Sequence, residues 1–164
     1  MIGSSSTIKY LVDTNILIGF SLWKPISLQL NDIFWNELEN ALKSGGWVLL
    51  DVVMNEVNSG FDGDLKKWCK QQAKNGLVQK LNNDHRQRAV DINNQYPMID
   101  QATQKSTVDT YLIAYAEANG LGVFSREAPR TNADELHKIP DVCDALGIKR
   151  LRQPKAFLKA IGFN

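Results

Sequence analysis

Apolar and polar positions change spacing along the chain, which predicts strands that alternate with helices. Short apolar runs that are typical of buried strands occupy residues 8–12, 47–50 and 121–124. Between the first two lies a stretch, 28–43, with helical spacing. Its apolar positions are Leu30, Ile33, Phe34, Leu38 and Leu42. Alternating strands and helices predict an α/β fold, here a three-layer α/β/α sandwich with a mainly parallel central sheet.

Turn-forming residues limit the remaining elements. Pro25 ends the first helix, Ser59-Gly60 ends the third, and Gly120 follows a later one. The other expected helices and the expected last strand are 14–22, 51–58, two helices between 63 and 95 that meet near 82–84, then 106–119, 141–146, the strand 148–151, and a helix from residue 154. Since no repeat or linker interrupts this order, we expect one domain over 1–164, with 1–7 as a flexible leader.

The composition is that of a globular protein with little excess charge. The chain has 164 residues, of which 43% are hydrophobic and 23% charged, and its formal net charge is +1. Any contact with nucleic acid must therefore come from a local basic patch and not from the global charge. Cys69 and Cys143 form no C-x-x-C unit, which favours two reduced core thiols. With no membrane-length apolar run and no signal peptide, we expect a soluble, cytoplasmic protein.

Two acids follow predicted strands directly. Asp13 comes after the apolar residues 10–12, and Glu127 comes shortly after the strand 121–124. Ligands of open α/β sheets gather outside the carboxyl ends of the strands, so both positions suit a functional site. A helix N-cap for Asp13 and an ordinary loop glutamate for Glu127 are the alternative interpretations.

A third acid is predicted on an apolar helical face. Val52, Val53 and Val57 define one side of the helix 51–58, and Glu56 falls within that arc whereas Asn55 faces away. A buried carboxylate needs a cation or a proton, because leaving it unpaired costs several kcal/mol. The alternative is a glutamate that extends to solvent or pairs with a lysine.

The helix 106–119 carries a fourth acid in a similar position. Thr110 and Glu117 are expected on its solvent face, whereas Asp109 points between Ile113 and Ala116. A capping box that starts at Ser106 explains the same aspartate equally well. If the strands are parallel neighbours, all four acids meet at one edge of the sheet. Clustered carboxylates repel one another, so the cluster predicts bound Mg²⁺ or Mn²⁺.

Four segments resemble, in the right order, the motifs of PIN domains. They are residues 10–18 (YLVDTNILI), 53–57 (VMNEV), 109–116 (DTYLIAYA) and 124–127 (FSRE), the last with Ser and Glu where the family pattern has Thr and Asp. The resemblance spans residues 9–127. It implies that Asp13, Glu56, Asp109 and Glu127 are the metal-binding and catalytic acids, supported by Asn15 and Ser125. Residues 138–143 (KIPDVC) resemble the tail of an uncharacterised PIN subfamily, in which Asp141 adds an outer-sphere contact or simply starts a helix.

The resemblance also implies an activity and partners. PIN domains of this kind are metal-dependent ribonucleases that hydrolyse RNA and leave a 5′-phosphate and a 3′-hydroxyl. Many small bacterial members are VapC-like toxins, which are dimeric and are held inactive by a cognate antitoxin. We therefore expect an endoribonuclease with an RNA substrate, an antitoxin partner, a homodimeric assembly and no membrane association.

Cations near the acids are the expected RNA contacts. Arg126 and Arg130 flank Glu127 and are the best candidates. Two further basic clusters are more often solvated faces, and the four tryptophans more often pack in a core or an interface. The clusters are Lys66, Lys67, Lys70 and Lys74, and Lys149, Arg150, Arg152, Lys155 and Lys159. His85 and His137 lie outside the acid motifs and are expected to be surface or core residues.

Two other functions remain compatible with the sequence. One is a non-catalytic PIN-fold module that binds protein or RNA. The other is a different Mg²⁺-dependent phosphodiesterase that acts on DNA. A haloacid-dehalogenase phosphatase is disfavoured, because Asp13-Thr14-Asn15 lacks the second acid of its D-x-D motif.

Overall fold

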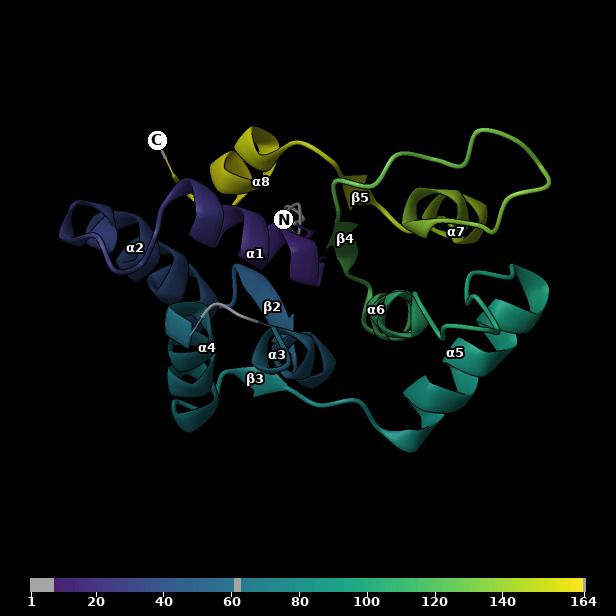
Figure 1. Cartoon of the computed structure of the whole chain (residues 1–164), viewed down its shortest axis with the longest axis horizontal. Helices are drawn as coiled ribbons and strands as arrows, with labels where there is room; N and C mark the ends of the chain where they lie inside the picture. The colour runs from purple at the N-terminus through teal and green to yellow at the C-terminus, as the bar shows by residue number, and fades with distance from the viewer. Residues whose placement is uncertain (1–7, 61–62, 164) are drawn as a thin grey trace, which may run out of the picture.

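The computed structural model describes residues 8–60 and 63–163 and contains one five-stranded sheet (Figure 1). Every strand pairs in parallel with its neighbours, in the order β3-β2-β1-β4-β5. The strands are β1 (Tyr10–Val12), β2 (Trp47–Leu50), β3 (Val78–Gln79), β4 (Gly122–Phe124) and β5 (Arg150–Leu151). The predicted α/β class is confirmed, and the sheet is wholly parallel. The expected leader, 1–7, lies outside the described residues.

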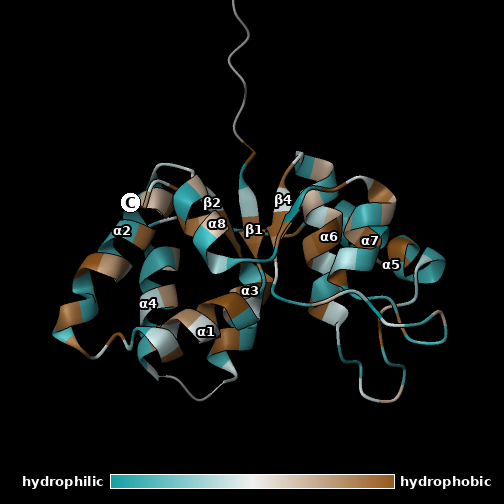
Figure 2. Ribbon diagram, turned by 90° about the horizontal axis from the view of Figure 1, so that it is seen from above, coloured by the Kyte–Doolittle hydropathy of each residue, from teal (hydrophilic) through white to brown (hydrophobic). Residues whose placement is uncertain are grey.

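Helices cover both faces of the sheet (Figure 2). On one side lie α1, α2, α4 and α8, and on the other lie α5, α6 and α7. The remaining helix, α3, contacts α1, α4 and α6. The helices are α1 (Thr14–Trp23), η1 (Gln29–Asn31), α2 (Asp32–Lys43), α3 (Asp51–Asn58), α4 (Gly63–Lys74), α5 (Asn83–Gln95), α6 (Thr107–Asn119), α7 (Ile139–Leu146) and α8 (Pro154–Ala160).

The stretch 28–43 differs from its prediction. It divides into the 3₁₀-helix η1 and the α-helix α2. Of its apolar positions, Phe34 and Leu38 are buried, but Leu30 and Ile33 are 80% and 72% exposed. The periodicity therefore identified the helix correctly and overestimated its apolar face. The two-residue strand β3 was not predicted.

The pairing of β1 with β4 joins distant parts of the chain. Tyr10 lies opposite Gly122, and a Cβ atom on Gly122 would come within 2.4 Å of the Tyr10 ring. Beyond the last strand residues, the Asp13 N–H donates to the Phe124 carbonyl at 3.0 Å. This register places Asp13 beside Ser125, at the carboxyl edge of the sheet.

Aromatic side chains fill the core beneath α1, α2 and α8. Trp47 and Trp35 are buried and donate their indole N–H groups to backbone carbonyls at 2.9 and 2.7 Å. Cys69 and Cys143 are free and buried, as expected, and burial raises the pKa of each thiol to about 12. Within the described residues, no helix combines the length and apolarity needed to span a membrane.

Candidate functional site

Three of the four predicted acids converge at the carboxyl edge of the sheet. Asp13 follows β1, Asp109 lies in the first turn of α6, and Glu127 follows β4. One carboxylate oxygen from each lies within 4.8 Å of the other two. Asp109 and Glu127 follow Asp13 by 96 and 114 positions in the sequence, so only the tertiary fold brings the three acids together.

Asp13 is the most buried of the three, with 4% of its surface exposed. Burial, followed by the negative charge of Glu127, raises its pKa from 3.8 to about 6. The Ser125 hydroxyl donates to Asp13 Oδ2 at 3.1 Å and accepts the Glu127 N–H at 3.2 Å. Ser125 thus links two of the acids through its hydroxyl group.

Asp109 carries the largest pKa shift of the cluster. Burial is the main cause, and the charges of Asp13 and Glu127 add to it, so its pKa rises from 3.8 to about 8. The alternative capping-box interpretation is not supported, because the Ser106 side chain makes no cap hydrogen bond at the start of α6. The prediction that Thr110 lies on the solvent face of α6 is wrong, because this residue is only 1% exposed.

Glu56 approaches the site differently from its prediction. It is an exposed residue, so the predicted position on a buried helical face is wrong. Its carboxylate accepts a hydrogen bond from the Thr14 hydroxyl and lines the same cavity as the three acids. Asn15 is exposed and also lines this cavity. Glu56 is thus at the edge of the site and outside the compact three-acid group.

The acids open into a cavity of about 730 Å³. Two lysines outside the predicted basic clusters, Lys105 and Lys138, line it, as does His137. Burial raises the pKa of Glu127, and the positive charges of Lys138 and Lys105 oppose that rise. No periodic pattern marks these residues, because both lysines lie in loops or at a helix boundary.

The two arginines expected near the acids lie elsewhere. Arg126 lines a second cavity, on the other side of α1. The Arg130 guanidinium donates to the carbonyls of Ala133 and Glu135 at 3.4 and 3.1 Å. Asp141 accepts the backbone N–H groups of Lys138 and Arg130 at 2.8 and 3.0 Å, so it fixes the loop before α7.

The histidines also separate into two roles. His85 Nδ1 accepts the Asn82 N–H at 3.1 Å and completes the N-terminal cap of α5, as expected for a structural residue. One ring nitrogen of His137 lies 3.2 Å from the Pro97 carbonyl, and its ring packs against Tyr96. His137 therefore lies on the wall of the acid cavity, although it belongs to none of the acid motifs.

The donor set of the three acids fits a hard divalent cation. All three pKa values are raised, chiefly by burial and, for the two aspartates, also by neighbouring carboxylates. A cation with oxygen ligands would remove this repulsion. The same chemistry makes a thiolate-binding metal a poor match, since Cys69 and Cys143 are absent from the cluster.

A family model described as "Domain of unknown function (DUF4411)" matches residues 10–163. The chain belongs to the DUF4411 family. The matched range of this DUF4411 chain includes every acid of the cavity, yet the family description assigns no chemistry to them. The chain matches no curated protein.

A solved structure, "Toxin-antitoxin complex from Klebsiella pneumoniae", has a chain that is 21% identical to the DUF4411 chain. The match covers 73% of this chain and 87% of that one, with a TM-score of 0.44. A likeness this distant says nothing of the activity of the DUF4411 chain. Its function has to be inferred from its own residues.

Proposed function

We propose that this DUF4411 chain is a Mg²⁺- or Mn²⁺-dependent endoribonuclease. The convergence of Asp13, Asp109 and Glu127, with carboxylate oxygens within 4.8 Å of one another, carries the proposal. The resemblance of residues 9–127 to the four PIN motifs supports it, since the three converging acids belong to three of those motifs.

Each residue around the acids has a distinct task in this proposal. Asp13, Asp109 and Glu127 hold the cation, and Ser125 fixes the first and last of them through its hydroxyl. Glu56, whose carboxylate is oriented by the Thr14 hydroxyl, binds the cation from the edge of the site. A bound divalent cation supplies charge neutralisation at the phosphate and lowers the pKa of water. Lys105 and Lys138 attract the RNA backbone toward the acids.

The cellular role we propose is that of a toxin restrained by a cognate antitoxin. Its support is the resemblance to VapC-like proteins, which also implies a homodimer and a cytoplasmic RNA target. An acid cavity open to solvent would need such a restraint in a cell full of RNA. An antitoxin that covers the cavity would supply it.

Cleavage of RNA tests the proposal. Purified protein with Mn²⁺ or Mg²⁺ should cut an RNA internally, and EDTA should abolish the cutting. Asp13→Asn removes a charged ligand without changing size, so the rate should fall by a factor of about 100 or more while the protein stays folded. The matched control is Asp51→Asn, which should cut normally, since Asp51 also follows a strand but lies outside the three-acid group and accepts the Val52 N–H.

The ends of the products identify the mechanism. Attack by water leaves a 5′-phosphate and a 3′-hydroxyl, whereas attack by the ribose 2′-hydroxyl leaves a 2′,3′-cyclic phosphate. Cyclic-phosphate ends, or cleavage that continues in EDTA, would contradict the metal-dependent mechanism. Cleavage of DNA in preference to RNA would move the assignment to a DNA phosphodiesterase.

A further inference from the structure

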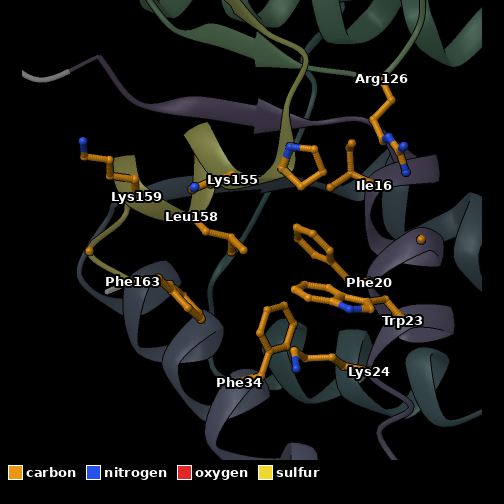
Figure 3. Close-up of a pocket in the computed structure, with 13 residues that line it drawn as sticks. Ile16, Phe20, Trp23, Lys24, Phe34, Arg126, Lys155, Leu158, Lys159 and Phe163 are labelled. Carbon is orange, nitrogen blue, oxygen red and sulfur yellow. The ribbon is translucent and has the colours of Figure 1, made fainter.

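A second cavity, of about 970 Å³, lies between α1, α2 and the C-terminal segment that contains α8 (Figure 3). Phe20 and Trp23 reach it from α1, Phe34 from α2, and Leu158 and Phe163 from the opposite side. This volume is at the upper end of the range for small-ligand sites. Nothing in the proposed chemistry of the acid cavity uses it.

Every charged side chain that lines this second cavity is a cation. They are Lys24, Arg126, Lys155 and Lys159, and the lining contains no acid among the residues the structure describes. The whole chain carries almost as many acids as bases, with a formal net charge of only +1. This local concentration of positive charge therefore selects an anionic ligand.

The apolar lining of the cavity is mostly aromatic. Trp23 is 58% exposed, and its ring centroid lies 5.7 Å from that of Phe34. The Lys24 ammonium lies 4.6 Å from the Trp23 ring centroid, so a positive charge stands directly beside an accessible ring. Aromatic rings with adjacent cations are the features that bind single-stranded nucleic acid, through base stacking and phosphate pairing.

Gly19 leaves space in the wall of the cavity. It lies within α1 and lines the cavity, and a Cβ atom built on it would meet nothing within 4 Å. Glycine inside a helix lowers its stability, and no neighbouring atom requires glycine here. A larger side chain at this position would enter the space that a ligand needs.

The second cavity adjoins the acid cavity. Arg126 lines the former and the next residue, Glu127, lines the latter. Helix α1 also contributes to both, with Thr14 and Asn15 on the acid side and Ile16 and Gly19 on the other. At about 1.5 Å per residue, Trp23 lies about 15 Å along α1 from Asp13. That distance corresponds to about four stacked nucleotides at 3.4 Å each.

We propose that the second cavity binds nucleobases of a single-stranded RNA whose scissile phosphate lies at the acids. Trp23 stacks a base at the mouth of the cavity, and Lys24, Arg126, Lys155 and Lys159 pair with the flanking phosphates. This inference rests on the proposed ribonuclease function and adds to it a binding site for a strand that is unpaired on one side of the cut. Arg126, expected to touch RNA, does so here and not beside the acids.

Binding of a fluorescein-labelled 12-nucleotide single-stranded RNA tests the inference. The measurement is fluorescence anisotropy in the Asp13→Asn background with EDTA, so that no strand is cut. Adding Trp23→Leu removes the ring and should weaken binding about tenfold, because base stacking on an aromatic side chain is lost. Adding Gly19→Leu fills the cavity and should weaken binding as much. The matched control is Leu22→Ala, since Leu22 is 76% exposed on the same helix and lines neither cavity.

The salt dependence gives a second, independent measurement. Lys155→Gln with Lys159→Gln should reduce the slope of log Kd against log salt by about 1.4, because each lost phosphate contact removes about 0.7. Lys66→Gln with Lys67→Gln on α4 should leave the slope unchanged, since neither residue lines the acid cavity or the second cavity.

The outcomes separate this inference from the proposed function. Binding within twofold of the Asp13→Asn parent for both Trp23→Leu and Gly19→Leu would overturn the second-cavity site even if the wild-type protein cuts RNA. Binding of a glutamate- and leucine-rich helical peptide that depends on Trp23, without RNA binding, would also overturn it and assign the cavity to a protein segment. RNA binding that depends on Trp23, in a protein that cuts no RNA, would uphold the site and remove the nuclease assignment.

Discussion

At the scale of single residues, the site is defined by carboxylates that the fold makes costly to ionise. Burial and neighbouring charge raise the pKa of Asp109 to about 8 and that of Asp13 to about 6. At a pH between 3.8, the ordinary aspartate pKa, and its raised pKa in the metal-free folded protein, each holds a proton that the unfolded chain releases. Folding and proton binding are therefore coupled at this site.

The sign of this coupling gives a prediction for Asp109→Asn. Because its folded pKa lies above its unfolded pKa, Asp109 contributes stability that is fully present below the unfolded value and is lost as the pH rises through the folded value. Metal-free wild-type protein should lose about 1 kcal/mol of unfolding free energy per pH unit between about pH 6 and pH 8. Asp109→Asn should flatten this dependence and be more stable than wild type at the upper end.

Urea unfolding at several pH values in EDTA measures the effect. Asp51→Asn serves as the control and should keep the wild-type slope, because Asp51 lies outside the acid cluster. An Asp109→Asn protein whose stability falls with pH as steeply as wild type would contradict the shifted pKa.

Sequence patterns predicted the positions of some residues of the site and not of others. Asp13 was predictable because an acid directly after an apolar strand lies at the edge of a parallel sheet. Glu56 was misplaced because a helical wheel gives a direction about the helix axis and not whether another element covers it. Lys105, Lys138 and His137 were missed because they reach the cavity from irregular segments, whose paths no periodicity encodes.

At the scale of elements, the patterns predicted nearly the whole order of strands and helices. The strand 47–50 and the helix 51–58 match β2 and α3 to the residue. Strand β3 was missed because two residues, Val78 and Gln79, are too few to show alternation. The exposure of Thr110 was wrong because α6 packs against α5, α7 and the sheet, which leaves little of its surface to solvent.

The close contact of β1 with β4 gives a prediction for Gly122→Ala. The added Cβ would lie 2.4 Å from a Tyr10 ring carbon and 3.0 Å from the Lys149 carbonyl, so the Tyr10 ring or the adjoining backbone must shift. We expect a loss of about 1–3 kcal/mol in unfolding free energy, the usual cost of overpacking. Gly19→Ala is the control and should be neutral or stabilising, because its Cβ meets no atom within 4 Å. Thermal unfolding of both variants measures the difference. Equal stability of Gly122→Ala and Gly19→Ala would contradict the close contact between β1 and β4 at Gly122.

At the scale of the whole molecule, a ligand that binds only the folded acid cluster should stabilise the entire chain. At a Mg²⁺ or Mn²⁺ concentration about 100 times its Kd, the gain is about 2.7 kcal/mol, or a rise in Tm of about 5–10 °C for a chain of this size. The double variant Asp13→Asn/Asp109→Asn should lose the response. A double variant that responds to metal like wild type would place the metal elsewhere.

The pairing of β1 with β4 also governs when the acid cluster assembles during synthesis of the chain. Asp13 and its hydrogen-bond partner Ser125 are separated by 112 positions, and the described residues between them include β2, β3, β4 and the helices from α1 to α6. A ribosome that adds about 5–20 residues per second needs about 6–22 seconds to cover that interval. Throughout this time the nascent chain holds Asp13 without Ser125 or Glu127, so the acid cluster does not yet exist. Under the proposed function, the growing chain cannot cut its own messenger RNA, and an antitoxin made alongside has those seconds to fold first.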